Sequence, residues 1–225
     1  MTAQRAISRQ SIPDAIADDL RERILSGEMA EGEPIRQEAL AKEYDVSRMP
    51  VREALKRLDA EGLVQLTNNR GASVTSHSLE EISEIFDMRI LLECDLFRRA
   101  IPNMTADHFA RCEELLRNMD LSYTTDAVEK WGILNFEYHM ALYDAAERKL
   151  TNEVLQGLYL QSDRYVRMHL SVLQQRAPAS DEHKQLLELA KAGNPDAASD
   201  VLDRHIRRTG NELLGLIAEK RAATA

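Results

Sequence analysis

The segment from Gln37 to Leu58 constrains the fold most, because it has the pattern of two short helices joined by a tight turn. Its second half carries apolar residues at i, i+3, i+4 and i+7, the spacing of an amphipathic helix that packs against a core. These residues are Val51, Ala54, Leu55 and Leu58. The chain is therefore expected to build a small helical core here, with the opposite face of this helix left in solvent.

The boundaries of the second helix are also marked in the sequence. Ser47 is a suitable N-cap, Pro50 falls in the first turn where a missing N–H does little harm, and Gly62 is placed to end the helix. The preceding turn is expected at Asp45 and Val46, because Asp tolerates left-handed backbone geometry. Together these signals predict a helix-turn-helix.

The exposed face of the second helix is cationic. At 100° per residue, four side chains share an arc of about 100° beside the apolar stripe and point outward. They are Arg48, Met49, Arg52 and Lys56. After Gly62, the stretches LVQL, TNNRG and ASV read as strand, turn and strand, which predicts a β-hairpin of the kind called a wing. This surface suits contact with DNA, and the alternative is a helix pair with an incidental basic face.

The same residues carry a resemblance to a known family. The pattern EALAKEYDVSRMPVREALKRLDAEGLV, followed by NNRGASV, resembles the winged helix of GntR-type bacterial transcription regulators, although Asp45 stands where that family usually has Gly. The resemblance implies a repressor that binds a palindromic operator in double-stranded DNA as a homodimer. The residues expected to contact DNA are Arg36, Gln37, Ser47, Arg48, Met49, Pro50, Arg52, Lys56, Arg70 and Gly71.

Charge and composition are compatible with this interpretation once the chain is divided. The whole sequence of 225 residues has a formal net charge of −9, which is unusual for a DNA-binding protein. Residues 47–72, however, hold five cationic side chains against three acidic ones, so the predicted DNA-facing region is locally positive. The length and the hydrophobic content of 44% favour two domains, expected at residues 1–77 and 78–225.

Targeting and redox signals are absent from the sequence. The first 20 residues have no apolar h-region, and no run approaches 18 apolar residues, so neither secretion nor a membrane span is expected. A cytoplasmic protein without a membrane partner is predicted. Cys94 and Cys112 are isolated and lack the spacing of a zinc or redox motif, which fits reduced cysteines.

Beyond residue 78 every long segment has helical periodicity, and Ser78 with Glu81 forms a capping box at the start. Helices are expected at about 79–101, 105–121, 125–147, 151–176, 181–192 and 195–221, the last one beginning with an Asn194 cap and Pro195. The predicted fold is mainly α. A winged helix-turn-helix of three helices and a β-hairpin is joined to an antiparallel, all-helical bundle.

Three histidines of the helical half are expected to point inward. His183 and His205 lie in line with apolar stripes, and Asn135 precedes His139 by four residues, so that both project from neighbouring turns into the same interior. Three imidazoles that converge in a bundle suit zinc or nickel, with Mn²⁺ and Fe²⁺ less favoured. The alternative is that each histidine is a core residue hydrogen-bonded to a carbonyl group.

The helical half also resembles a known domain, the FCD domain of the FadR branch of GntR regulators. The matching residues are Arg89-x-x-Leu-Glu93, the Asn135/His139 pair, Glu182-His183 and His205. In similar members of that branch, one Asp and three His hold a divalent metal. The resemblance therefore implies a metal site at Asn135, His139, His183 and His205, with the Asn135 amide in place of a carboxylate.

A small organic-acid effector is the second expectation from the resemblance. In the family, the position of Arg89 faces the effector cavity, so Arg89 is expected to clamp a carboxylate, with Glu93 and Arg164 as further effector-binding candidates. The alternative is that Arg89 only pairs with Glu93 within the helix. A metal-dependent enzyme with an accessory N-terminal domain is the alternative function, but no catalytic motif such as HExxH is present, so a regulator without enzymatic activity is preferred.

Overall fold

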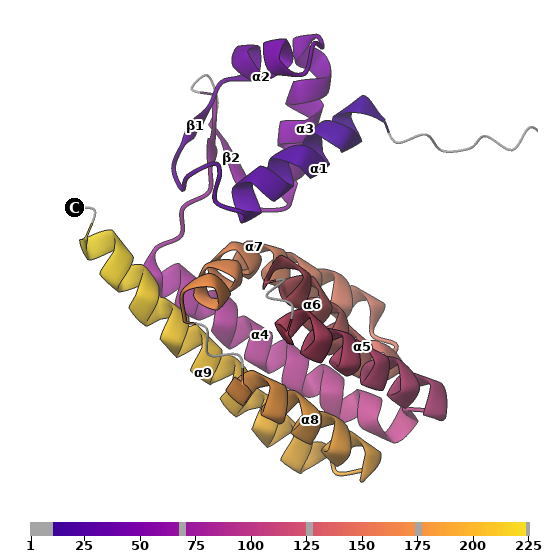
Figure 1. The fold of residues 1–225 in the computed structure, drawn as a ribbon. Helices are drawn as coiled ribbons and strands as arrows, with labels where there is room; N and C mark the ends of the chain where they lie inside the picture. The colour runs from indigo at the N-terminus through magenta and orange to yellow at the C-terminus, as the bar shows by residue number, and fades with distance from the viewer. Residues whose placement is uncertain (1–10, 68–70, 125–127, 174–176, 224–225) are drawn as a thin grey trace, which may run out of the picture. The chain divides into compact units, whose positions relative to one another are not determined.

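The computed structural model describes residues 11–67, 71–124, 128–173 and 177–223. The chain divides into two compact units, Met1–Ser76 and His77–Ala225, and each is described by itself. The first is a winged helix-turn-helix with a small sheet, and the second is built from helices (Figure 1). The predicted fold class, mainly α with a small antiparallel sheet near the N-terminus, is confirmed.

The helices of the first unit are α1 (Ile12–Leu25), α2 (Gln37–Glu43) and α3 (Arg48–Ala60). The predicted apolar stripe of α3 forms the centre of the unit, and its four residues are fully buried. Asp45 adopts the left-handed conformation expected of the turn, with φ of 52°, and Gly62 does so after α3, with φ of 77°. Ser47 occupies the N-cap position of α3, but its side chain makes no capping hydrogen bond.

The wing is part of a three-stranded antiparallel sheet. Strands β2 (Val64–Thr67) and β3 (Gly71–Val74) form the predicted hairpin. A short strand, β1 (Pro34–Ile35), pairs with the other edge of β3, which gives the order β1-β3-β2. The sequence did not predict β1, because two residues are too short for an alternating pattern. The turn that contains Arg70 lies outside the described residues.

The second unit consists of six α-helices and two short 3₁₀ helices within the described residues. They are α4 (Leu79–Ala100), η1 (Ile101–Asn103), α5 (Ala106–Thr124), α6 (Val128–Tyr143), η2 (Asp144–Ala146), α7 (Lys149–Leu173), α8 (Ala177–Lys191) and α9 (Pro195–Ala222). No helix in these described ranges is both long and apolar enough to cross a membrane.

Two of the predicted helix boundaries in this unit were wrong. The helix expected over residues 125–147 ends at Tyr143, because η2 and the left-handed Glu147, with φ of 52°, turn the chain before α7. Helix α8 begins at Ala177 rather than at residue 181. Pro178 therefore lies in its first turn, where proline needs no hydrogen-bond partner for its nitrogen.

The caps predicted for α4 and α9 are present. The hydroxyl of Ser78 accepts a hydrogen bond from the Glu81 N–H at 3.1 Å, and the Glu81 carboxylate accepts one from the Ser78 N–H at 2.7 Å. Asn194 accepts a hydrogen bond from the N–H of Ala197, with Pro195 as the first helical residue. These caps set the starting points of the two helices that pack together most extensively.

Helices α4 and α9 run side by side in opposite directions (Figure 1). Gly210 of α9 faces Phe86 near the start of α4, whereas Ser199, near the start of α9, contacts Cys94 in the second half of α4. A Cβ atom at Gly210 would lie 3.0 Å from Cγ of Phe86, whose side chain is buried. The close approach of the two helices therefore depends on the absence of a side chain at Gly210.

We predict that Gly210→Ala destabilises the protein although alanine is the better helix former. The added methyl group would lie 3.0–3.3 Å from three atoms of the buried Phe86 side chain, and such overpacking costs about 1–3 kcal/mol, which equals or exceeds the roughly 1 kcal/mol gained in helix propensity. Gly215→Ala is the matched control, because a Cβ there meets no atom within 4 Å. Calorimetric melting should be lower for Gly210→Ala and unchanged or higher for Gly215→Ala. A Gly210→Ala protein as stable as the control would show that α4 can move away.

Candidate functional site

The residues predicted to contact DNA lie on the surface of the first unit. Arg36, Ser47, Arg48, Met49, Arg52, Lys56 and Gly71 are exposed, and Gln37 and Pro50 are half-buried. Met49 keeps 60% of its surface exposed and so is accessible to a partner on this surface. The role of these residues stays a prediction, and Arg70 lies outside the described residues.

An acidic residue that the sequence interpretation missed lies on the same surface. The carboxylate of Glu38, near the start of α2, forms an ion pair with Arg48 at 2.8 Å, and both side chains are largely exposed. In the part of the chain that the structure describes, Arg52 and Lys56 have no acidic partner. Glu38 partly neutralises Arg48. The cations of α3 that are most available to phosphates or base edges are therefore Arg52 and Lys56.

Three histidines meet in the interior of the second unit, each from a different helix. His139 belongs to α6, His183 to α8 and His205 to α9, and all three are buried. Each offers a ring nitrogen, and these nitrogens lie within 4.8 Å of one another. The Nε2 atoms of His139 and His183 are 3.3 Å apart. Nitrogens bound to one tetrahedral ion at about 2.0–2.1 Å would be separated by roughly the same distance, so the cluster can hold a metal ion.

The environment keeps two of the imidazoles neutral. Burial, followed by the proximity of His183 and His205, holds the pKa of His139 well below its usual value. Burial, followed by His205 and Arg208, does the same for the pKa of His183. A neutral imidazole has a free lone pair on one nitrogen, and that form is the one that binds metals.

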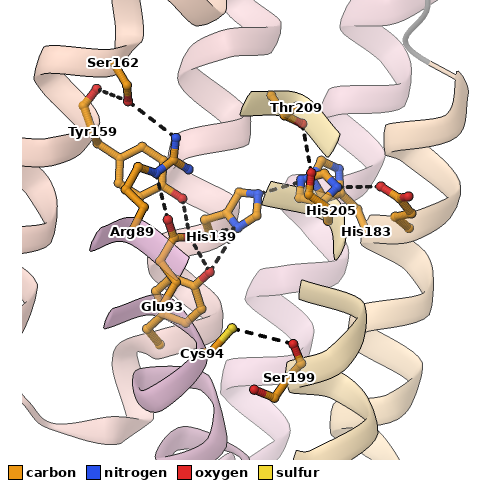
Figure 2. Close-up of polar contacts among 12 residues, drawn as sticks. Arg89, Glu93, Cys94, His139, Tyr159, Ser162, His183, Ser199, His205 and Thr209 are labelled. Atoms are coloured by element: carbon orange, nitrogen blue, oxygen red, sulfur yellow. Dashed lines mark hydrogen bonds and ion pairs between the residues drawn. The ribbon is translucent and has the colours of Figure 1, made fainter. Parts of the chain in front are cut away.

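Hydrogen bonds on the far side of His139 determine which of its nitrogens carries the proton. The hydroxyl of Tyr143 donates to Oε2 of Glu93 at 2.7 Å and lies 3.1 Å from Nδ1 of His139. Since the single hydroxyl proton is used on the carboxylate, the tyrosine oxygen must accept a hydrogen bond from Nδ1–H of His139. Nε2 of His139 is then unprotonated and faces the other histidines (Figure 2).

His205 has a comparable partner at the opposite edge of the cluster. Its Nδ1 lies 2.6 Å from Oε2 of Glu182, which also accepts a hydrogen bond from Arg208 at 2.7 Å. Partial burial opposes ionisation of Glu182, but the hydrogen bond with His205 and the charge of Arg208 leave its pKa below the usual value. A carboxylate can only accept, so Nδ1 of His205 donates and Nε2 is the nitrogen left for another partner.

Arg89 forms a buried ion pair with Glu93 one turn later on α4. Nε of Arg89 donates to Oε1 of Glu93 at 2.8 Å, and the guanidinium carbon lies 3.9 Å from the ring centroid of Tyr159. Its NH1 also reaches the hydroxyl of Ser162, at 3.4 Å (Figure 2). Burial alone would lower the pKa of Arg89, but Glu93 and Tyr159 raise it above its usual value. The intrahelical pair that the sequence left as an alternative is therefore formed, and it is buried.

Three polar atoms of the predicted site are buried without a hydrogen-bond partner in the described structure. Oδ1 of Asn135 and NH1 of Arg164 are buried and make no hydrogen bond within the described structure. Nδ1 of His183 is a third such atom, although the carbonyl of His183 accepts a hydrogen bond from Tyr138 at 2.7 Å. Buried polar atoms without partners are costly, so each of these is a position where a ligand or ion would be stabilised.

The sequence interpretation missed the tyrosines of this network. Tyr143 and Tyr159 both donate to Oε2 of Glu93 at 2.7 Å, and burial raises the pKa of each tyrosine well above its usual value, so both remain donors. Tyr143 follows His139 by four residues, which is a local signal that could have been found. Tyr159 comes from α7, and only the tertiary fold brings it to Glu93.

Comparisons with known proteins agree with this architecture. Residues 13–74 match the family described as bacterial regulatory proteins, gntR family, and residues 84–208 match the FCD domain. The chain is 32% identical over 203 residues to the uncharacterized HTH-type transcriptional regulator BphR of Paraburkholderia xenovorans, covering 88% of this chain and 83% of that protein. It is 29% identical over 152 residues to the gluconate operon transcriptional repressor of Bacillus subtilis, covering 68% and 62%. Among solved structures, E. coli McbR/YncC has the same fold, with a TM-score of 0.79 at 20% identity over 92% of this chain and 99% of that one.

We predict that the protein binds about one divalent ion per chain through the histidine cluster. Added Ni²⁺ or Zn²⁺ should raise the melting temperature, because an ion held by α6, α8 and α9 stabilises only the folded state. His139→Ala should abolish this rise. His108 is the control, because it lies outside the cluster and its Nδ1 accepts a hydrogen bond from the Thr105 N–H. The His108→Gln variant should have the melting temperature of the wild type and the same increase on addition of metal. Equal metal responses in both variants would place the ion elsewhere.

Proposed function

The chain belongs to the GntR family of bacterial transcription regulators and carries an FCD domain, and we propose that it represses transcription from a palindromic operator under the control of a small carboxylate. We assign residues 1–77 to DNA binding and residues 78–225 to effector binding and dimerisation. The observation that carries the ligand-controlled part is the buried cluster of three histidines in the helical unit. A cytoplasmic location follows from the DNA partner.

DNA binding as a homodimer is inferred from the size of one recognition unit. A single helix-turn-helix reads few base pairs, and dimers of this motif bind two half-sites about one helical turn of DNA apart. Helix α3 presents Arg52 and Lys56 without an acidic partner in the described residues, so these side chains are available to base edges and phosphates. The proposed operator is therefore a short inverted repeat in which each half-site receives one α3 in the major groove.

The proposed cofactor is Zn²⁺, with Ni²⁺ as the second choice. The donor set fits such an ion, because His139 and His205 each use Nδ1 for a hydrogen bond and leave Nε2 for a ligand, and His183 offers a third ring nitrogen. Neutral imidazoles suit zinc and nickel better than the harder ions Mn²⁺ and Mg²⁺. Asn135 is the proposed fourth ligand, since its enclosed Oδ1 lacks a partner and the residue lies one turn before His139.

For the effector, the charges of the helical unit favour an anion that engages Arg164. Arg89 is already neutralised by Glu93 and covered by the ring of Tyr159, so an effector carboxylate would have to compete with Glu93 for it. Arg164 has an enclosed NH1 that finds no acceptor among the described residues. A bound ion would carry a charge of +2 with only neutral ligands. We therefore propose that a small carboxylate binds between the ion and Arg164.

Catalysis is not part of this proposal, because the chain belongs to a family of regulators. The two carboxylates that contact the histidines are also unsuited to act as a general base. Glu93 accepts from Arg89 and Glu182 accepts from Arg208. Each carboxylate is paired with an arginine, so neither is placed to act on a substrate.

The DNA-binding part predicts that Arg52→Ala weakens binding to an operator selected from random DNA by about 1–3 kcal/mol, the range for loss of one side chain that pairs with a base edge. Arg48→Ala should cost less, because Glu38 already shares the charge of Arg48. Titrations at two salt concentrations would separate phosphate contacts from base contacts. Arg99→Ala, which removes an exposed cation of the second unit, is the control. Unchanged affinity in an Arg48→Ala/Arg52→Ala double variant would contradict the assignment of α3 to the DNA.

The effector-binding part predicts that changes at Asn135 and Arg164 both weaken carboxylate binding but differ in their effect on metal affinity. Asn135→Asp adds an anionic ligand, so it should tighten metal binding while it weakens carboxylate binding, because the charge that attracts the carboxylate is reduced. Arg164→Gln should weaken carboxylate binding and leave metal affinity unchanged. Calorimetry with Ni²⁺, followed by a panel of mono- and dicarboxylates, measures both affinities. If Asn135→Asp leaves carboxylate affinity unchanged or raises it, the carboxylate does not sense the charge of the metal.

A further inference from the structure

Two carboxylates that are not proposed ligands lie close to the proposed metal site. An ion bound by His139, His183, His205 and the Asn135 amide would have no anionic ligand, which is unfavourable in a buried site. Two carboxylates nevertheless lie directly behind two of the histidines, those of Glu93 and Glu182. Building on the metal site proposed above, we propose that Glu93 and Glu182 form an outer shell that orients His139 and His205 and offsets the positive charges of Arg89 and Arg208, which would otherwise repel the ion.

The first arm of this outer shell runs through a tyrosine. Oε2 of Glu93 lies 3.7 Å from Nδ1 of His139, too far for a hydrogen bond, and the Tyr143 hydroxyl bridges the two with contacts of 2.7 and 3.1 Å. Glu93 and Tyr143 are fully buried and His139 is 1% exposed. Tyr143 accepts a hydrogen bond from Nδ1–H of His139 and donates one to the Glu93 carboxylate. This bridge therefore fixes the tautomer of His139 whose Nε2 can bind a metal.

The second arm is direct and lies closer to the surface. Nδ1 of His205 contacts Oε2 of Glu182 at 2.6 Å, a pairing of carboxylate and imidazole that is common behind metal-bound histidines. Glu182 keeps 26% of its side chain exposed, so a change at this position disturbs the core far less than a change at Glu93. The third histidine has no such partner, since its Nδ1 is buried without a hydrogen bond in the described structure.

The carboxylates of the two arms differ in their other hydrogen-bond partners. Glu93 also accepts from Arg89 and Tyr159, so its removal would leave a buried guanidinium group without a counter-ion and endanger folding. Tyr143→Phe avoids this problem, because it removes only the bridging hydroxyl and leaves the Arg89–Glu93 pair in place. Glu182→Gln keeps the shape and the accepting oxygen of Glu182 but removes its charge.

The test measures Ni²⁺ affinity of the full chain for the wild type, Tyr143→Phe and Glu182→Gln. The single tryptophan, Trp131, lies with its ring 6.2 Å from that of His183, so quenching of its fluorescence can follow the titration. The matched control is Glu113→Gln, which removes a carboxylate that pairs with Lys191 between helices and contacts none of the three histidines. The absorption spectrum of the Co²⁺ form reports the geometry at the ion, which a purely structural defect elsewhere would not change.

Loss of either arm should weaken Ni²⁺ binding by about 10- to 100-fold, the usual effect of removing an outer-shell partner, whereas Glu113→Gln binds like the wild type. The Co²⁺ spectrum should change in the same two variants, and melting of the metal-free proteins shows separately that they fold. Wild-type affinity in Tyr143→Phe would overturn the role of Glu93, and wild-type affinity in Glu182→Gln that of Glu182. A wild-type protein that binds neither Ni²⁺ nor Zn²⁺ would instead overturn the metal site itself, and the outer shell with it.

Discussion

The helical unit depends on a fully buried carboxylate in its interior and on the hydrogen-bond donors that surround it. Glu93 has no exposed surface, yet it accepts hydrogen bonds from Arg89, Tyr143 and Tyr159, which come from α4, α6 and α7. Burying a carboxylate without such donors would be strongly unfavourable, and removal of one partner from a buried ion pair costs about 3–5 kcal/mol. Arg89 lies on the same helix as Glu93, but the two tyrosines can reach Glu93 only when α6 and α7 are packed against α4 as observed, so the carboxylate favours one arrangement of the helices.

The same carboxylate connects the parts of the proposed ligand site. One oxygen of Glu93 holds Arg89, and the other reaches His139 through Tyr143. An anion that drew Arg89 away, or an ion that pulled on His139, would act on the same group. A tenfold change in DNA affinity requires a difference of only about 1.4 kcal/mol between two states of the protein. The gain or loss of one buried hydrogen bond is of this size, so a rearrangement of this network involves enough free energy for such a change.

Features set by neighbouring residues could be predicted from the sequence, and features set by distant ones could not. The stripe of α3, the left-handed Asp45, and the caps at Ser78 and Asn194 follow from local spacing and backbone preference, and the structure contains all of them. The inward direction of the three histidines followed from the periodicity of their helices. By contrast, the pairing of β1 with β3 and of Tyr159 with Glu93 depends on contacts between distant segments, which one sequence does not display.

Local reasoning also failed where one residue had two possible partners. The spacing of Arg89 and Glu93 allowed both an intrahelical pair and a free cation facing an effector, and only the tertiary structure reveals that the pair is buried beside Tyr159. Glu38 was overlooked because its partner Arg48 lies on the next helix, across the turn. In both cases the missing information was how close a side chain lies to residues of another helix, Tyr159 for Arg89 and Glu38 for Arg48.

The central claim is that the three histidines of the helical unit bind one metal ion together. X-ray absorption of the full chain loaded with one equivalent of Zn²⁺ measures the ligands of that ion directly. We expect nitrogen and oxygen neighbours at about 2.0–2.1 Å, with the outer scattering of three imidazole rings. The same measurement on His139→Ala should lose one imidazole or lose the bound ion. A spectrum of the wild type with no imidazole contribution, or with sulfur ligands, would contradict the account.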